Sequence, residues 1–274
     1  MALARTLAVA LTGLDGELIE VECDISAGLP GISFTGLPDA SVVESRDRLR
    51  SALLNSEVDW PDRRVTVALL PADVRKVGSR FDLAVGVAIL AASGQVPLEA
   101  VSGAVWIAEL GLDGRLRPVR GVLPAVLAAR RAGVRRVVVA EANAAEAALV
   151  GDMDVRSASS LTDVVGWLTG AGPVLPAAAS GALSTAPDPT DTDLADVAGQ
   201  PVARRALEIA AAGGHHLYLV GTPGAGKTML AERLPGILPP LDDPAAIEVT
   251  AVHSIAGLLG SRAELIRRPP FQAP

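Results

Sequence analysis

The sequence predicts two domains, an N-terminal α+β domain followed by the beginning of an α/β domain. Three observations support this prediction. Segments of strand and helix character alternate through residues 1–170, a stretch rich in Pro, Ala, Ser, Thr and Asp follows at 171–192, and a glycine-rich loop separates an apolar run from a helical run at 221–228. Because the composition of 171–192 cannot bury a core, we predict a flexible linker there. The second domain is then predicted, incomplete, over 193–274.

Composition and charge allow two cores but exclude several kinds of chemistry. Half of the 274 residues are apolar and only 3% are aromatic, so the cores must be packed from Ala, Val and Leu. The net charge of −7 provides no overall basic field, so any contact with DNA must be local or made by an assembled ring. The single cysteine, Cys23, excludes an internal disulfide and a cysteine metal site.

No segment is predicted to enter a membrane. The longest strongly apolar run without charge, 83–98, is too short to span a bilayer. The N-terminus alternates apolar and polar residues and runs into Asp15 and Glu17 without a small-residue cleavage site. We therefore expect a cytoplasmic protein. Metal-ligand spacing is also missing from the three histidines, His215, His216 and His253.

The first domain is predicted to begin with a β-hairpin. Residues 5–11 and 17–24 alternate apolar and polar around a glycine-containing turn at 13–16. A loop with one short strand at 31–34 follows, and then a helix capped by Asp39 or Ser41 that continues to about Asn55. The residues expected to face inward from this helix are Val42, Val43, Leu49, Leu53 and Leu54.

The rest of the first domain is predicted to alternate strands and helices. A strand at 65–70 ends at Pro71, an apolar helix at 82–92 ends near Gly94, and residues 105–110 and 116–119 form a hairpin around Asp113-Gly114. The remaining expected elements are a helix at 122–132, a strand at 137–139, a short helix capped by Asn143, a strand from Val155 and a helix at 161–168.

The second domain is predicted to supply a strand, a loop and a helix in that order. A helix at 201–212 begins with Pro201, at a position where the missing N–H costs little. A strand at 217–220, the glycine-rich loop and a helix at 229–234 follow, and Pro235-Gly236 break that helix. Further segments are expected at 245–249 and 250–260.

The glycine-rich loop matches the phosphate-binding pattern G-x-x-x-x-G-K-[ST] without a mismatch. Its glycines let the backbone fold tightly so that N–H groups point at phosphate oxygens, and the following helix N-terminus adds partial positive charge. Lys227 is expected to reach the β- and γ-phosphates, and the Thr228 hydroxyl to bind Mg²⁺. The sequence therefore predicts binding of ATP and Mg²⁺, with Lys227 as the catalytic residue. The predicted nucleotide-binding residues are Gly221, Thr222, Pro223, Gly224, Ala225, Gly226, Lys227, Thr228 and Met229.

A second motif that ATP hydrolysis requires is not found. An acidic pair normally ends a second apolar strand, where it holds Mg²⁺ and orients water. After Thr228, no run of four apolar residues precedes Asp-Glu, Ile247-Glu248 is too weak a match, and no arginine finger can be placed. The chain is therefore expected to stop partway through its nucleotide-binding domain and to turn over no ATP.

Several stretches resemble one protein family. Residues 31–38 and 72–83 resemble the N-terminal domain of magnesium-chelatase-like AAA+ ATPases of the competence (ComM/YifB) type, and 196–200, 221–228 and 268–274 resemble further signatures of that family. The resemblance implies an AAA+ motor that assembles as a hexameric ring and acts as a DNA helicase or branch-migration factor in natural transformation. The alternatives are a chelatase-like ATPase that remodels proteins and a nucleotide-binding fragment without hydrolysis.

The N-terminal domain also resembles the proteolytic domain of Lon-type proteases, which has a ribosomal S5-like fold. Lon uses a serine nucleophile with a lysine base. The position of that serine falls on Arg80 and the position of that lysine on Ala125, while Ser79 is one residue away. We therefore expect this domain to be non-proteolytic. Arg80, with Arg115, Arg117 and Arg120, could line the opening of a ring, although surface ion pairing is the favoured role for all four.

Overall fold

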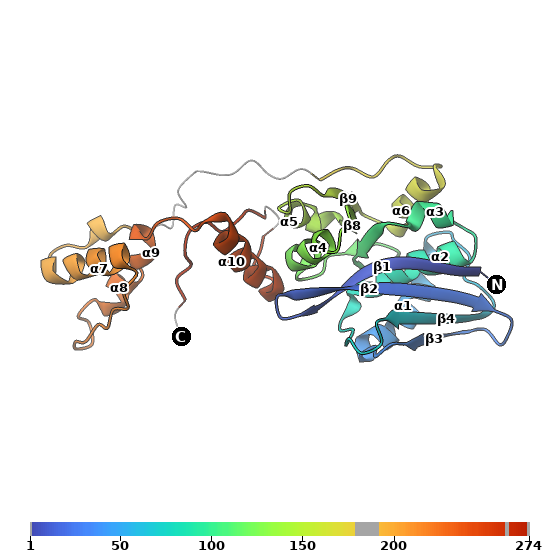
Figure 1. Cartoon of the computed structure of the whole chain (residues 1–274), viewed down its shortest axis with the longest axis horizontal. Helices are drawn as coiled ribbons and strands as arrows, with labels where there is room; N and C mark the ends of the chain where they lie inside the picture. Colours follow the sequence, from blue (N-terminus) through green and yellow to red (C-terminus); the bar gives the residue numbers. More distant parts are fainter. Residues whose placement is uncertain (1, 179–191, 261–262, 273–274) are drawn as a thin grey trace. The chain divides into compact units, whose positions relative to one another are not determined.

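The computed structural model describes residues 2–178, 192–260 and 263–272. The chain divides into two compact units, Met1–Ala182 with Ala251–Glu264, and Leu183–Thr250 with Leu265–Pro274. Figure 1 labels their elements. This division differs from the predicted one by grouping Ala251–Glu264 with the first unit. Within the described ranges, no helix is both long and apolar enough to cross a lipid bilayer.

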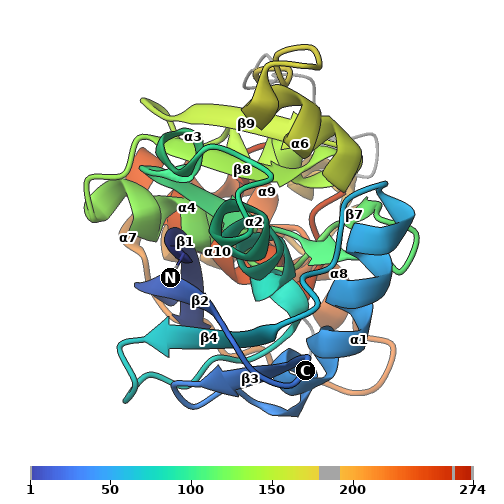
Figure 2. The ribbon, with the colours of Figure 1, turned by 90° about the vertical axis from the view of Figure 1, so that its right-hand side faces the viewer.

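A seven-stranded sheet forms the centre of the first unit. Its strand order is β3-β4-β2-β1-β5-β8-β9. The strands β1, β2 and β4 pair antiparallel, whereas β3, β5, β8 and β9 add in parallel (Figure 2). Their bounds are β1 (Ala2–Thr12), β2 (Asp15–Ser26), β3 (Gly31–Thr35), β4 (Arg64–Leu70), β5 (Ala104–Ile107), β8 (Arg136–Ala140) and β9 (Asp154–Ala158). The predicted β1–β2 hairpin is confirmed, with Thr12 opposite Asp15.

Helices cover both faces of this sheet. They are α1 (Ala40–Asn55), α2 (Asp82–Ala92), α3 (Leu98–Val101), α4 (Val122–Arg131), α5 (Ala144–Ala147) and α6 (Leu161–Thr169), with short 3-10 turns at Ser79–Phe81 and Glu141–Asn143. One buried cluster joins the sheet to α1, α2 and α6, and a second joins it to α4 and α5. In β5, Trp106 packs into the first cluster while Val105 and Ile107 pack into the second. Side chains alternate in this way because successive residues of a strand point to opposite faces.

The inward face of α1 was predicted only in part. Val42, Leu49 and Leu53 are buried as expected, but Val43 is 47% exposed and Leu54 is 52% exposed. The buried stripe of this helix is Val42, Ser45, Leu49, Ala52 and Leu53. These positions recur at the spacing of one helix face, so that small Ser and Ala occupy places which a search for large apolar residues overlooks.

Two other expectations for the first unit were wrong. The single strand predicted at 105–110 is divided into β5 and β6 (Glu109–Leu110), because the carbonyl of Ala108 accepts a hydrogen bond from Leu83 N (3.2 Å) instead of continuing the ladder. The hairpin itself forms between β6 and β7 (Leu116–Arg117). Asn143 precedes α5 but does not cap it, since its side chain bonds the backbone N and O of Val119 at 2.9 and 3.0 Å.

The predicted linker begins as ordered structure. Ala178 N donates to Val155 O (2.9 Å), Ser157 N donates to Pro176 O (3.2 Å), and Leu175 is buried. Residues 171–178 are therefore attached to β9, because Leu175 supplies apolar surface that the composition of the whole stretch hides. The remainder of the predicted linker, 179–191, lies outside the described residues.

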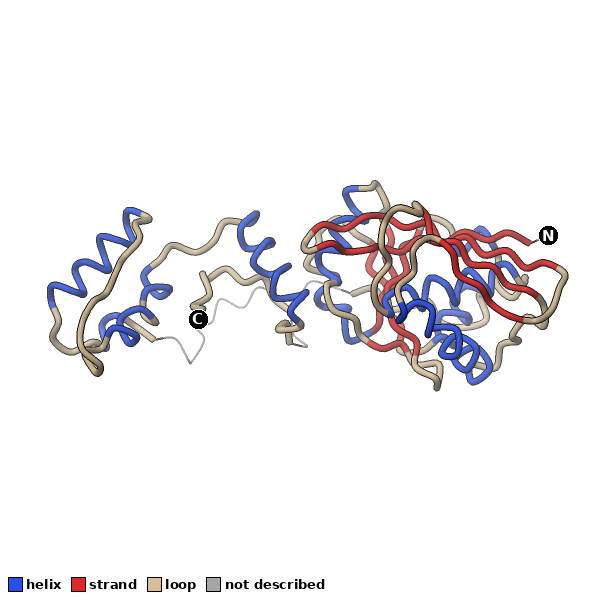
Figure 3. The backbone as a smooth tube through the Cα atoms, turned by 90° about the horizontal axis from the view of Figure 1, so that it is seen from below, coloured by secondary structure: helices blue, strands red, loops and turns tan. Residues whose placement is uncertain are grey.

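The second unit contains helices and loops among its described residues (Figure 3). They include a 3-10 turn at Leu194–Asp196, α7 (Pro201–Gly213), α8 (Lys227–Ala231), α9 (Leu234–Ile237) and α10 (Asp243–Ala256), of which α10 continues into the first unit. The helix predicted from Pro201 is confirmed as α7. The segments predicted at 245–249 and 250–260 instead fall largely within α10.

The strand predicted at 217–220 does not form, and the helix after the loop is shorter than predicted. Tyr218 is 90% exposed and Val220 is 79% exposed, and no described segment pairs with this run. A β-strand is stable only when a neighbour satisfies its N–H and C=O groups, which an apolar pattern alone does not reveal. The helix ends at Ala231 instead of Leu234, and Pro235 lies in the first turn of α9 instead of breaking a helix.

An ion pair links α1 to the start of α2 inside the first unit. Arg48 donates from Nε and Nη2 to the two Asp82 carboxylate oxygens at 3.0 and 3.2 Å, and Leu110 N donates to Oδ2 at 3.3 Å. Burial raises the pKa of Asp82 to about 6, although Arg48 and the Leu110 amide oppose that change.

We predict that Asp82 makes unfolding pH-dependent. The folded state holds this proton more tightly than the unfolded state between the ordinary pKa of 3.8 and about 6. Stability from this group is therefore complete below about pH 4 and is lost as the pH rises through about 6. Relative to Asp82→Asn, wild type should lose about 1.4 kcal/mol of unfolding free energy per pH unit across this range. Urea unfolding at pH 4, 5, 6 and 7 measures this difference, and a constant difference would contradict the prediction.

Candidate functional site

The glycine-rich loop turns directly into α8. Ala225 N donates to Thr222 O at 3.2 Å, which closes a tight turn before the helix. Gly224 and Gly226 both have φ +81°, a left-handed conformation that side chains with a Cβ rarely adopt. Gly226 is also the residue immediately before the helix. The two glycines thus have a backbone reason to occupy these positions, as the phosphate-binding pattern predicts.

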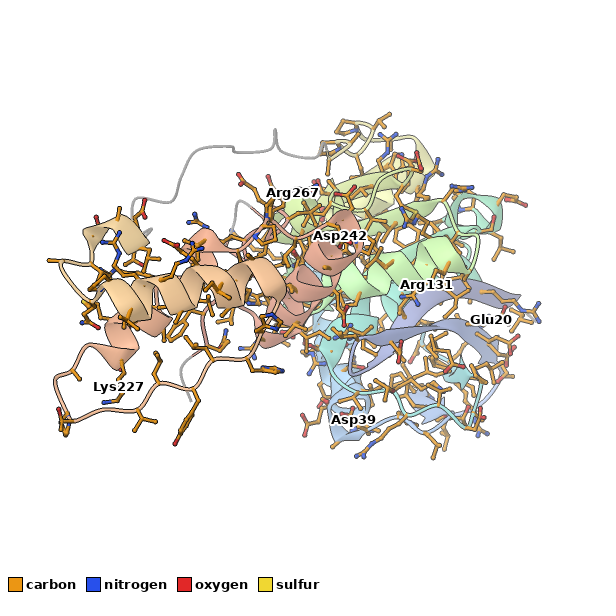
Figure 4. The ribbon with its side chains drawn as sticks, turned by 60° about the vertical axis from the view of Figure 1, so that its left-hand side comes forward. Glu20, Asp39, Arg131, Lys227, Asp242 and Arg267 are labelled. Carbon is orange, nitrogen blue, oxygen red and sulfur yellow. The ribbon has the colours of Figure 1, made fainter. Side chains whose placement is uncertain are left out.

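The side chain of Lys227 points from the first turn of α8 back toward the loop. Its ammonium donates to Gly221 O at 3.0 Å and to Thr222 O at 2.9 Å (Figure 4). The charge therefore lies beside the loop backbone that the motif assigns to phosphate, on a flexible stem that can move toward an anion. Thr228 is exposed at the first turn of the helix, with its side chain free for a metal ion in the surroundings that the structure describes.

A small core supports the loop from below. It is formed by Leu194, Val197, Leu207 and Leu230, with Met229 and Leu219 packed against it. Arg233 ties the helix to the start of the unit, since Nη1 donates to Met229 O (2.9 Å) and Nε to Asp193 O (3.1 Å). A Cβ on Gly226 would lie 3.1 Å from Met229 Cε. Met229 is thus a packing residue beneath the loop in addition to its predicted contact with nucleotide.

Gln200 is a loop contact that the site prediction missed. It lies at the start of α7 with φ +51°, and its Nε2 approaches Ala225 O at 3.5 Å. A Cβ on Gly226 would meet that same nitrogen at 3.0 Å. The residue belongs to the stretch 196–200, which resembles a family signature, and that signature was the only sequence signal for it.

The donor set fits a magnesium nucleotide and no larger metal site. Backbone amides and an ammonium suit phosphate oxygens, and a threonine hydroxyl suits Mg²⁺, which keeps several waters and takes few protein ligands. The described residues contain no group of three or more His, Cys, Asp or Glu side chains that could hold a metal ion. The acidic candidate Ile247-Glu248 lies inside α10 and not at the end of a strand.

The positions aligned with the Lon serine and lysine carry different chemistry. Arg80 donates from Nη2 to Arg120 O at 3.0 Å, burial lowers its pKa, and its Nη1 is buried without a partner in the described structure. Ala125 is fully buried in α4. Ser79 is hydrogen-bonded to the carboxylate of Glu109.

Lys76 does not replace the missing base. It is fully buried, its ammonium donates to Pro71 O, and burial lowers its pKa. Of the other arginines predicted for a ring opening, Arg115 lies 3.7 Å from the Asp113 carboxylate on the surface, an arrangement in keeping with surface ion pairing.

Comparisons with known proteins identify the class and then the family. A mixed α/β unit and a glycine-rich loop that turns into a helix agree with a chelatase-like AAA+ protein. A family model described as subunit ChlI of Mg-chelatase matches residues 21–143, and one described as magnesium chelatase, subunit ChlI, matches residues 193–274. The chain belongs to this magnesium-chelatase-like family, which confirms the family predicted from the sequence.

Curated relatives agree with this assignment. An uncharacterized protein of Mycobacterium tuberculosis is 51% identical over 100% of this chain and 54% of its own length. Competence protein ComM of Haemophilus influenzae is 44% identical over 93% of this chain and 50% of its own length, and YifB of Salmonella typhimurium is 42% identical over 100% and 53%. The chain spans about half the length of the curated relatives it matches.

A weaker similarity concerns the N-terminal part. Lon protease of Mycolicibacterium smegmatis is 28% identical over 57% of this chain and 21% of its own length. Together with the mixed α/β sheet, this similarity supports a Lon-like N-terminal region.

We predict that Ser79 does not react with a fluorophosphonate probe. Its hydroxyl donates a hydrogen bond to the Glu109 carboxylate, a much weaker base than a neutral amine, and the nearby lysine is buried against a carbonyl, so that the serine has no lysine base. Mass spectrometry after incubation with the probe should find unmodified Ser79, with trypsin in the same tube as a labelled control. Labelling that disappears in Ser79→Ala would show that the serine is active.

Proposed function

We propose that this chain is the nucleotide-binding part of an AAA+ motor that binds ATP with Mg²⁺ through residues 221–229. The observation that carries the proposal is the position of the Lys227 ammonium, beside the backbone of a loop whose two left-handed glycines match the motif. In this proposal the N-terminal unit is a non-proteolytic Lon/S5-like domain, residues 1–170, and the nucleotide domain begins at 193.

The roles of the loop residues follow from their chemistry. The backbone N–H groups that the loop offers, to which Pro223 contributes none, bind phosphate oxygens, Lys227 neutralises the β- and γ-phosphates, and Thr228 binds the magnesium ion. A magnesium ion held by Thr228 would offset part of the negative charge of the phosphates. Met229 supports the loop by packing against Leu230 and its neighbours.

We extend the proposal to the motor's substrate by analogy with a relative named competence protein. The full-length protein would be a cytoplasmic, ring-forming, hexameric ATPase that moves DNA strands during branch migration in transformation and recombination. The similarity to ComM supports this reading. The net charge of −7 means that DNA must be held by local groups or by the ring.

A protein-remodelling ATPase is the second candidate, favoured by the family models named for magnesium chelatase. A nucleotide-binding module without hydrolysis is the third, since an acidic pair at a strand end is missing from this chain. A DNA motor requires ATPase activity that DNA stimulates, and a protein-remodelling ATPase requires ATPase activity that a protein stimulates. A nucleotide-binding module without hydrolysis requires no ATPase activity.

We predict that Lys227→Ala abolishes binding of Mg-ATP. Removing the ammonium takes away the only side-chain cation that the motif supplies to the β- and γ-phosphates. Isothermal titration calorimetry should detect binding to wild type and none to the variant. Arg205→Ala is a matched control, since it removes an exposed charge from α7 that pairs with Glu208. Equal affinities of wild type and Lys227→Ala would refute the proposed site.

We predict that the full-length protein binds a branched DNA duplex only with ATP and more tightly at low salt. Each phosphate contact releases counterions, so the logarithm of the affinity should fall linearly with the logarithm of the salt concentration. Fluorescence anisotropy between 50 and 200 mM salt measures this slope. Salt-independent binding, or binding without nucleotide, would contradict the motor reading.

A further inference from the structure

The first unit has an open sheet edge at β3. The strand is terminal in the sheet order and pairs in parallel with β4 on one side, and no described strand pairs with its other side (Figure 2). An exposed edge presents unpaired N–H and C=O groups that another chain can use. Edges of this kind are often protected by a helix, a bulge or a charge. The backbone groups and side chains beside the β3 edge therefore determine what it can bind.

The pairing with β4 determines which groups of β3 face outward. Gly31 N donates to Arg63 O at 3.3 Å, and Gly31 and Ser33 lie opposite Arg64 and Thr66. In a parallel ladder, alternate residues direct both backbone groups to the same neighbour. The N–H and C=O groups of Ile32 therefore point to the free edge, and so do those of Phe34.

A hollow lies on each face of the sheet beside this edge. On the α1 face, a hollow of about 310 Å³ is lined by Pro30, Ile32 and Trp60, with Arg46, Asp47, Arg50 and Asp62 also in its lining. On the opposite face, a hollow of about 360 Å³ is lined by Leu29, Ser33 and Arg64, among others. Leu29 is 89% exposed. An added strand would direct alternate side chains into the two hollows.

The two hollows differ in charge. The lining of the α1-face hollow contains two arginines and two aspartates, and Arg46 lies 3.7 Å from Asp47. These charges cancel, so the hollow beside the aromatic ring of Trp60 carries no net charge. The opposite hollow contains Arg64 without an acidic residue in its lining. Asp24 lies diagonally across on β2, two register positions from the residue opposite Arg64, but no ion pair joins them among the described residues. The second hollow therefore favours an acidic side chain.

We propose that β3 is a docking edge for an extended peptide segment of a partner protein in which apolar and acidic residues alternate. The partner backbone pairs with Ile32 and Phe34. Its apolar side chains enter the hollow bounded by Ile32 and Trp60, and its acidic side chains approach Arg64. Main-chain pairing supplies affinity and the two hollows supply specificity, as in other cases of strand addition.

The geometry sets the spacing of the partner sequence. Because side chains of a strand alternate between faces, an acidic residue and an apolar residue that use the two hollows must lie an odd number of positions apart. A segment with acidic residues at both faces would place one of them against the neutral hollow beside Asp62 and lose affinity.

The test uses a fluorescein-labelled seven-residue probe, acetylated and amidated, with the core Asp-Val-Asp-Val-Asp. Fluorescence anisotropy with the 274-residue chain should show saturable binding. Two further probes carry N-methyl groups on alternate residues, one on the odd set and one on the even set. One of these sets faces β3 and the other faces solvent, so one methylated probe should lose binding and the other should keep it. Loss with neither set would overturn the proposal.

Variants of the protein test the charge. Arg64→Glu should weaken binding of the acidic probe about threefold to tenfold, because attraction between opposite charges at the surface is replaced by repulsion. It should strengthen binding of the matched probe with Lys in place of Asp. Arg75→Glu is the control, an exposed arginine outside both hollows, and should change neither affinity beyond a uniform charge effect.

Two results would assign the edge differently. Equal effects of Arg64→Glu and Arg75→Glu would show that only overall charge matters, and would overturn the docking site. Self-association of the chain in sedimentation velocity, competed away by the probe, would identify a second copy of this chain as the occupant and overturn the proposal of a separate partner. Both measurements are independent of nucleotide binding at 221–229, so failure here leaves the proposed function unaffected.

Discussion

The pairing of backbone N–H and C=O groups is the constraint on which the rest of this structure depends. In the first unit the ladder is continuous from β3 to β9, and each inner strand has a neighbour on both sides. In the second unit the apolar run at 217–220 has the side chains of a buried strand but no described partner, and its residues other than Leu219 remain exposed. Apolar side chains alone do not make a strand, because every unpaired backbone group removed from water costs free energy. One unit is therefore organised around its sheet, whereas the other is organised around a small helical core.

The glycine-rich loop at 221–228 satisfies the same constraint in another way. Gly224 and Gly226 bend its backbone, Ala225 N donates to Thr222 O, and the carbonyls of Gly221 and Thr222 accept from the Lys227 ammonium. Lys227 is thus a hydrogen-bond donor to the loop that precedes it. Because the contacts of this ammonium are to exposed carbonyl groups, exchanging them for a phosphate requires little rearrangement of the surrounding core. Leu230 and Met229 pack beneath the loop and connect it to the small core.

Local patterns predicted much of this protein, and long-range pairing explains most of the errors. The hairpin, α1, α2, α4, α7 and the glycine-rich loop follow from alternation, caps and turn residues close together in the chain. The division of 105–110 could not be predicted, because it depends on Leu83 reaching Ala108. Asn143 is a residue type that often caps helices, yet its side-chain amide is hydrogen-bonded to the backbone of Val119, which is distant in sequence. Gln200 was not predicted as a site residue for the same reason, since its contact with Ala225 joins the start of α7 to the glycine-rich loop.

The two halves of the chain also differ in what sequence similarity can transfer. Similarity to Lon protease supports the framework of the first unit, whereas the positions that we align from the sequence with its serine and lysine are Arg80 and Ala125. The Arg80 guanidinium donates a hydrogen bond to Arg120 O and, being a cation, cannot take a proton from Ser79, whose hydroxyl donates to Glu109. The strands and helices of the first unit pair one another's backbone groups and pack against one another. A catalytic side chain contributes little to that packing, so it can be exchanged without loss of the framework. In the second unit the reverse holds, because the loop keeps its lysine, threonine and glycines on a framework with far less internal support. Chemistry and architecture are therefore separable in this protein, and each must be argued from its own residues.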